Sequence, residues 1–281
     1  MTMMDLSLKR TMQKIRRISS LLIVFLGIHG CTFSFESVEY RKAQRNIKGN
    51  SLDRALFHFS RILKKSPDSD LALESARTAA RIATLQQGDF LRAVEFYRHI
   101  VIYSPEPAER KEAQQRIATI FFQNLNNYEQ AIVEYNKLLK LPHSPTEAYQ
   151  YRLNVARSYF QLSNFFQALV EVEELLEFNL NDDQLFEVSL MKGNIKLTKK
   201  ELDQAVKIFT ELKDQFPERS RAEHIGINIA VTYEELGDFA QAISILEVLK
   251  NDYPTPEFIE LKIKRLEERQ ANQPGARGPV R

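Results

Sequence analysis

The 281-residue chain has few of the residues and motifs that build catalytic or cofactor sites. Its single cysteine, Cys31, excludes an internal disulfide. Its nine glycines are scattered, and no run of them is able to cradle a phosphate group. The 39 basic and 37 acidic residues leave a formal charge of +2, which is too near zero for a protein that binds chiefly nucleic-acid phosphates. We therefore expect no nucleic-acid partner.

Catalytic arrangements are missing as well. Four histidines follow the first thirty residues: His58, His99, His143 and His224. No two of them have the i, i+4 spacing of a helical metal site. The GxSxG elbow of serine hydrolases does not occur. Adjacent acids such as Glu173 and Glu174 diverge by about 100° around a helix and do not face each other. We therefore expect that the protein is not an enzyme and binds no metal, cofactor or small-molecule substrate. The least favoured alternative is an enzyme whose site is not recognised.

Six copies of one amphipathic segment fill most of the chain. Each begins at a turn, continues as a helix and carries an alanine in the same register: Ala55, Ala93, Ala131, Ala168, Ala205 and Ala242. The alanines are separated by 38, 38, 37, 37 and 37 residues. Five copies end at a proline, which cannot continue a helix: Pro67, Pro105, Pro142, Pro217 and Pro254. This fixed period indicates a helical repeat array, and no segment shows the period-two alternation of a strand.

The pattern closely resembles the tetratricopeptide repeat, from about Glu36 to Arg269. The resemblance implies an all-α, right-handed superhelical solenoid of about six helix hairpins, closed by a C-terminal capping helix. First helices are expected at about 37–48, 72–86, 109–124, 147–162, 185–197 and 221–236, and the capping helix at 255–270. Where units of the family carry a glycine in the first helix, only Gly193 conforms. We assign the solenoid to residues 38–270 and a disordered tail, rich in Pro, Gly and Arg, to 271–281.

The first thirty residues read as a targeting segment. A basic stretch precedes an apolar core, Ser19–Ile28, that is too short to span a bilayer. Gly30-Cys31 follows and resembles a bacterial lipobox, although His29 replaces the usual small residue. The resemblance implies cleavage after residue 30, acylation of Cys31 and a lipidated linker at 31–37. The alternative is an ordinary signal peptide followed by an incidental thiol.

In the resembled family, particular turns of the first helices line an inner groove that binds partners. Those positions here predict a groove of mixed polar and apolar character: Arg116, Gln123, Asn124, Gln150, Leu153, Arg157, Phe160, Gln161 and Asn194. Such a groove suits an extended peptide or a helix. The terminal-carboxylate clamp of chaperone-binding members is not supported, because Leu190 stands in place of a lysine. The alternative is plain solvated surface.

Together these features predict a lipid-anchored adaptor that faces the periplasm from the bacterial outer membrane. Thr32 is not Asp, which by resemblance to bacterial lipoprotein sorting leaves the outer membrane open as the destination. Its partners would be other envelope proteins. The chain resembles the repeat lipoprotein of the β-barrel assembly machine and the pilotins that help secretin rings assemble for type IV pili. The alternative function is regulation of peptidoglycan synthesis or cell division.

Overall fold

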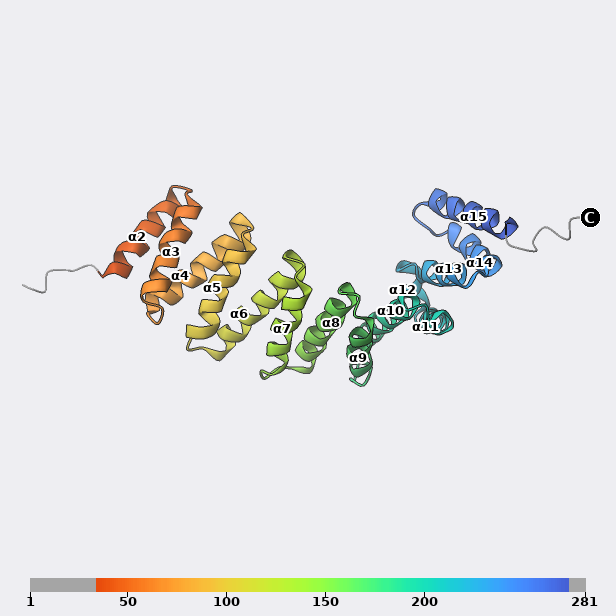
Figure 1. Cartoon of the computed structure of the whole chain (residues 1–281), viewed down its shortest axis with the longest axis horizontal. Helices are drawn as coiled ribbons and strands as arrows, with labels where there is room; N and C mark the ends of the chain where they lie inside the picture. Colours follow the sequence, from red (N-terminus) through yellow and green to blue (C-terminus); the bar gives the residue numbers. More distant parts are fainter. Residues whose placement is uncertain (1–33, 273–281) are drawn as a thin grey trace, which may run out of the picture. The chain divides into compact units, whose positions relative to one another are not determined.

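The computed structural model describes residues 34–272, and every regular element in that range is a helix (Figure 1). The all-α prediction is therefore confirmed for these residues. The expected leader, its cleavage site and Cys31 lie outside the described residues, as does the tail from residue 273 onward. Within the described range, none of the helices combines the length and apolar character needed to cross a membrane.

The chain forms two compact units, residues 1–110 and 111–281. The described part of the first unit contains two hairpins, α2 (Phe35–Lys48) with α3 (Leu52–Lys65), and α4 (Asp70–Ile82) with α5 (Phe90–Tyr103). A π-helical turn, η1 (Ala83–Gln87), extends α4. The first helix begins two residues earlier than expected, because the Ser34 hydroxyl accepts a hydrogen bond from the Ser37 amide at 3.3 Å and caps it.

The second unit continues the same alternation of first and second helices. The junction between the units falls within α6 (Pro107–Thr119). The π-helical turn η2 (Ile120–Asn124) extends this helix. The helices that follow are α7 (Tyr128–Leu139), α8 (Pro145–Gln161), α9 (Phe165–Leu176), α10 (Asp182–Thr198), α11 (Leu202–Gln215), α12 (Pro217–Ala222), α13 (Ile225–Leu236), α14 (Phe239–Lys250) and α15 (Pro256–Ala271). Helices α8, α10 and α13 each pack on the second helix of their own hairpin, and η2 packs on α7.

The six repeated alanines are fully buried. All six have 0% exposed surface: Ala55, Ala93, Ala131, Ala168, Ala205 and Ala242. The residue five positions before each alanine adopts a left-handed backbone: Asn50, Gly88, Asn126, Ser163, Lys200 and Gly237. This residue ends the first helix, and the next residue is the N-cap of the second. The register predicted from the sequence is confirmed by these shared features.

The two π-helical turns account for the difference between 38 and 37 residues. Each lies within one of the two 38-residue intervals, at the end of a first helix. There, the amides of Asp89 and Asn127 donate to carbonyls six residues earlier, both at 2.9 Å. In a 37-residue interval, the equivalent amide of Asn164 donates to Tyr159, five residues earlier. A π turn thus absorbs one extra residue without moving the alanine out of register.

The sixth first helix differs from the prediction. One helix was expected at 221–236, but α12 and α13 are separate, and His224 between them has a left-handed backbone with φ of 54°. Only Phe216 separates α11 from Pro217, whose ring sets the φ of a first helical turn, so α12 starts almost at once. The break places Gly226 so close to α14 that an added Cβ would lie 2.7 Å from Cδ1 of Leu249.

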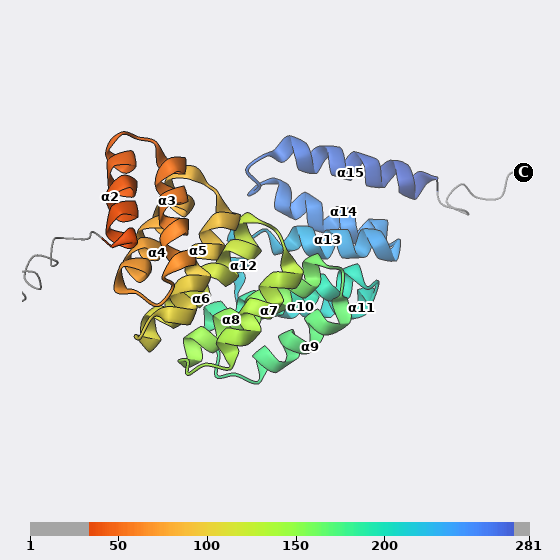
Figure 2. The same cartoon turned by 60° about the vertical axis from the view of Figure 1, so that its left-hand side comes forward.

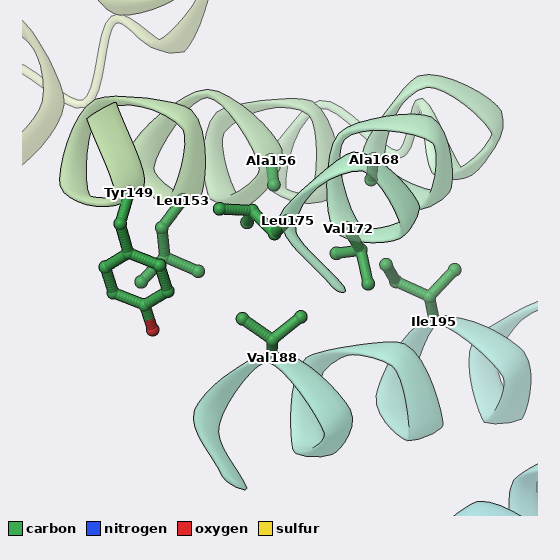
Figure 3. Packing of buried hydrophobic residues seen from close by; sticks show 8 residues of the cluster. All are labelled: Tyr149, Leu153, Ala156, Ala168, Val172, Leu175, Val188 and Ile195. Carbon is green, nitrogen blue, oxygen red and sulfur yellow. The ribbon is translucent and has the colours of Figure 1, made fainter. Parts of the chain in front are cut away.

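Within the second unit, the core lies between successive hairpins. Figure 3 shows one cluster in which Tyr149, Leu153 and Ala156 of α8 face side chains of α9 and α10. The last hairpin is covered by α15, which lies along α14 (Figure 2) and buries Ile259, Ile263 and Leu266. The other side of α15 is charged and exposed, with Glu260, Lys264, Glu267 and Glu268. A polar outer face is what a terminal cap of a repeat array requires.

Candidate partner-binding groove

A hollow of about 330 Å³ opens on the first-helix side of the second unit. Helices α8 and α10 form its two walls, and α12 closes one end. It is lined by Leu153, Arg157, Phe160, Gln161, Phe186, Glu187, Leu190, Met191, Asn194, Arg219 and Glu223. We call this hollow the α8–α10 groove. Its volume lies at the lower end of the range of small ligand sites, so it holds a few side chains rather than a domain.

Five of the nine residues predicted from the sequence meet in this groove: Leu153, Arg157, Phe160, Gln161 and Asn194. Leu153 is only 1% exposed and forms part of the floor. Arg116 and Gln150 line a separate hollow of about 540 Å³ between α6 and α8. Gln123 and Asn124 are exposed at the end of η2 and line neither hollow.

Arg157 is held by an acid that the sequence analysis did not single out. Its guanidinium contacts Glu187 Oε1 at 2.5 Å, and the Tyr149 hydroxyl donates to Glu187 Oε2 at 2.6 Å. Burial, and then the Glu187 carboxylate, raise the pKa of Tyr149 above its usual range, so its hydroxyl stays protonated as the donor. Glu187 therefore fixes one wall of the groove through two partners.

Arg219 at the groove's end is fixed in a similar way. It contacts Asp183 Oδ1 at 2.6 Å, and its guanidinium carbon lies 4.2 Å from the centre of the Phe186 ring. The two arginines are thus each paired with an acid, and the groove is close to electrically balanced. A balanced groove selects partners by shape and hydrogen bonds more than by net charge.

Both walls of the groove also carry apolar groups, and α10 adds an amide. Phe160, Leu190 and Met191 present partly buried apolar side chains. Asn228 of α13 donates through Nδ2 to Oδ1 of Asn194 at 3.0 Å, which leaves the Asn194 amide hydrogens for another acceptor. The arrangement suits a segment that inserts an apolar side chain and hydrogen-bonds through its backbone.

Sequence reasoning missed five of the residues that line the groove: Phe186, Glu187, Met191, Arg219 and Glu223. Glu187 lies three residues before Leu190 and seven before Asn194, so extending that helical stripe backwards would have found it. Arg219 had no such signal, because it enters the groove on α12, which exists only through the unpredicted break.

A larger hollow of about 680 Å³ lies on the second-helix side, between α11 and α14. Its floor includes Ile229 and Tyr233, and Val248 on its rim is 73% exposed. None of the residues predicted from the sequence lines it. We favour the α8–α10 groove because polar anchors and apolar groups converge there.

The described part of the chain has a helical-repeat fold. The tetratricopeptide repeat family model matches residues 112–144 and 227–256, which cover α6–α7 and α13–α14. These two segments are tetratricopeptide repeats, and the described chain has the tetratricopeptide-repeat fold that the sequence predicted. No curated protein sequence matches the chain.

Solved structures share the fold at low identity. A tetratricopeptide repeat protein from Parabacteroides merdae ATCC 43184 is 19% identical with a TM-score of 0.50, covering 84% of this chain and 88% of its own. YrrB, described as a repeat protein with an unusual peptide-binding site, is 18% identical with a TM-score of 0.50, covering 74% and 97%. PilW, described as a type IV pilus biogenesis factor, is 18% identical with a TM-score of 0.50, covering 82% and 99%.

Proposed function

We propose that this protein is an adaptor that holds a peptide or helix of a partner protein in the α8–α10 groove. The observation that carries this proposal is the convergence of Arg157, Phe160 and Asn194 from two first helices on one hollow. Arginine and aromatic side chains are enriched among the residues that dominate binding energy. The peptide-binding site named for YrrB supports such a use of this fold.

The groove favours a particular partner chemistry. An apolar side chain would fill the space beside Phe160, Leu190 and Met191, and a backbone carbonyl would accept from the Asn194 amide. An acidic side chain gains little here, because Glu187 already neutralises Arg157 at 2.5 Å. The best ligand is therefore an apolar segment of low net charge, either extended or helical.

We place this adaptor in the bacterial envelope, anchored by a lipid on Cys31 and facing the periplasm from the outer membrane. The basic stretch, the short apolar core and Gly30-Cys31 support this location. Its function there would be assembly of envelope complexes, through insertion of outer-membrane proteins or building of secretin rings and pili. The fold shared with PilW, a pilus biogenesis factor, supports the second route.

Affinity capture from solubilised envelopes tests the groove. We expect Arg157→Ala with Phe160→Ala to abolish capture of the main partner, since truncating a true anchor costs about 2 kcal/mol or more. The matched control is Phe166→Ala with Arg265→Ala, which removes the same side chains at exposed positions outside the groove. If both variants retain the same partners, the groove proposal is wrong.

The anchor is tested separately. Cys31→Ser should release the protein from membranes or leave its leader uncut, because stable anchoring depends on acyl chains. Incorporation of a labelled fatty acid into the unaltered protein, and its loss in the variant, is the direct measurement. An unlabelled wild-type protein would contradict the lipid anchor without affecting the groove.

A further inference from the structure

The first hairpin carries a charge opposite to the rest of the described chain. Helices α2 and α3, with their turn, contain eight bases and three acids, a net charge of +5 over residues 35–65. Residues 66–272 contain 24 bases and 33 acids, a net charge of −9. The near-neutral total of the whole chain conceals this separation.

The basic side chains of the hairpin are exposed, whereas Glu39 is buried and Asp53 is paired with a base of another helix. All eight bases are exposed: Arg41, Lys42, Arg45, Lys48, Arg54, Arg61, Lys64 and Lys65. Glu39 is only 2% exposed and is surrounded by Lys42, His58 and Arg61 at 2.8–2.9 Å. Asp53 is exposed but contacts Arg92 of α5 at 3.3 Å. The hairpin therefore presents a strongly positive surface.

An aromatic side chain stands within this positive surface. Arg54, Phe57, Arg61 and Lys64 follow each other at helical spacing on α3, opposite its buried side. Phe57 is 60% exposed, and the Arg61 guanidinium carbon lies 5.9 Å from its ring centre. At the same end of the hairpin, Lys65 Nζ lies 3.9 Å from the centre of the Phe35 ring. Bases interleaved with exposed aromatic groups are typical of a surface that rests on a membrane interface.

We propose that this α2–α3 surface binds the headgroups of an anionic phospholipid membrane. Each base near such a surface strengthens binding about fivefold, from roughly 1 kcal/mol per charge. The exposed ring of Phe57 gains free energy from contact with the apolar part of a lipid but not from contact with phosphate groups. The surface therefore suits a membrane better than a nucleic acid. Helices α2 and α3 lie side by side (Figures 1 and 2), and Lys42 of α2 and Arg61 of α3 both contact Glu39, which brings bases of the two helices together.

The position of the surface in the chain also favours a membrane. Cys31 precedes Phe35 by four residues, so an anchor there would hold α2 within about 14 Å of the bilayer. The argument from the distance between Cys31 and α2 rests on the lipid anchor proposed above. The charge and the exposure of the α2–α3 surface are independent of that anchor.

Vesicle cosedimentation tests the surface without the acyl group. The protein used is the chain from residue 32 onward, which retains every helix that the structure describes, with its fold checked by circular dichroism and melting. We expect it to bind phosphatidylcholine vesicles that contain phosphatidylglycerol, and not pure phosphatidylcholine. Binding should weaken as salt is raised, because exposed charges are screened over about 8 Å at physiological ionic strength.

Two triple variants with equal loss of charge locate the binding. Arg54→Gln, Lys64→Gln and Lys65→Gln together should weaken vesicle binding at least about tenfold. The control, Lys140→Gln, Lys264→Gln and Arg265→Gln, removes three exposed bases from the second unit and should change little. Phe57→Ser should weaken binding to vesicles but not to short duplex DNA.

Three results would overturn the proposal: no binding to anionic vesicles, equal weakening by both triples, or duplex DNA bound as tightly with no effect of Phe57→Ser. The groove variant, Arg157→Ala with Phe160→Ala, should bind vesicles like the unaltered chain. Failure of the groove proposal or of the acyl anchor is thereby separated from failure of the membrane surface.

Discussion

Gly193 of α10 lies against the ring of Phe209 of α11 so closely that a Cβ on the glycine would be 2.8 Å from both Cδ1 and Cζ. Phe209 is 0% exposed and fills the space between the two helices of the fifth hairpin. A ring carbon cannot approach a real Cβ at that distance. The glycine is therefore required by packing and not by its backbone freedom.

Gly193→Ala should destabilise the protein by about 1–3 kcal/mol, since the buried ring must shift to admit a methyl group. Chemical denaturation followed by circular dichroism measures the change. Adding Phe209→Leu to Gly193→Ala should recover part of the lost stability, because the smaller leucine leaves room for the methyl group of the alanine. Strictly additive effects of the two substitutions would contradict the contact.

The alanine register predicts a second stability difference. Ala205→Leu should cost about 1–3 kcal/mol, because the alanine is 0% exposed between two packed helices. Ala240→Leu makes the same change at an exposed position of α14 and should alter stability by less than about 0.5 kcal/mol. Thermal melting of both variants is the measurement, and equal shifts would show that the register is wrongly assigned.

Glycine substitutions should change stability in opposite directions at a left-handed turn position and within a helix. Ser163 has a φ of 57°, a conformation that costs an L-residue about 1 kcal/mol and glycine almost nothing. Ser163→Gly should therefore raise the melting temperature. Ser244→Gly, in the exposed interior of α14, should lower stability by about 0.5–1 kcal/mol. The same loss in both variants would contradict the strain at Ser163.

Much of the fold follows from the sequence because it repeats. The alanine register, the turns and the proline stops each recur six or five times, so every copy supports the others. Single events had no such support. The break at His224 occurs once, and although the sequence shows the extra residue of each 38-residue interval, it does not show that the π turns η1 and η2 absorb it.

The groove was partly predictable for the same reason. Arg157, Phe160 and Asn194 lie on first helices whose facing side follows from helical spacing. The ion pair with Glu187 could not be read from spacing, because it joins residues 30 positions apart on different helices. A paired arginine attracts an acid less than a free one, so the ion pair favours a ligand of low net charge. Phe160 also packs at 5.5 Å from Phe165, so its truncation will lower the melting temperature.

The start of α8 gives a prediction about pH. The Ser144 hydroxyl accepts from the Glu147 amide at 3.2 Å, and the Glu147 carboxylate accepts from the Ser144 amide at 2.8 Å, which together form a capping box. Lys111 Nζ also contacts Glu147 Oε1 at 2.7 Å. Lys111, followed by the Ser144 amide, lowers the pKa of Glu147 from its ordinary 4.5 to about 2.

A carboxyl whose pKa is lowered by folding stabilises the protein above its unfolded pKa, and the benefit disappears as pH falls through the folded pKa. Glu147→Gln should therefore lower the melting temperature at neutral pH, and the difference from the unaltered protein should shrink between pH 4.5 and about 2. In a Lys111→Met background, Glu147→Gln should show a smaller effect and less dependence on pH, because the main source of the shift is gone. A difference that stays constant down to pH 2 would show that the Glu147 charge contributes nothing to the start of α8.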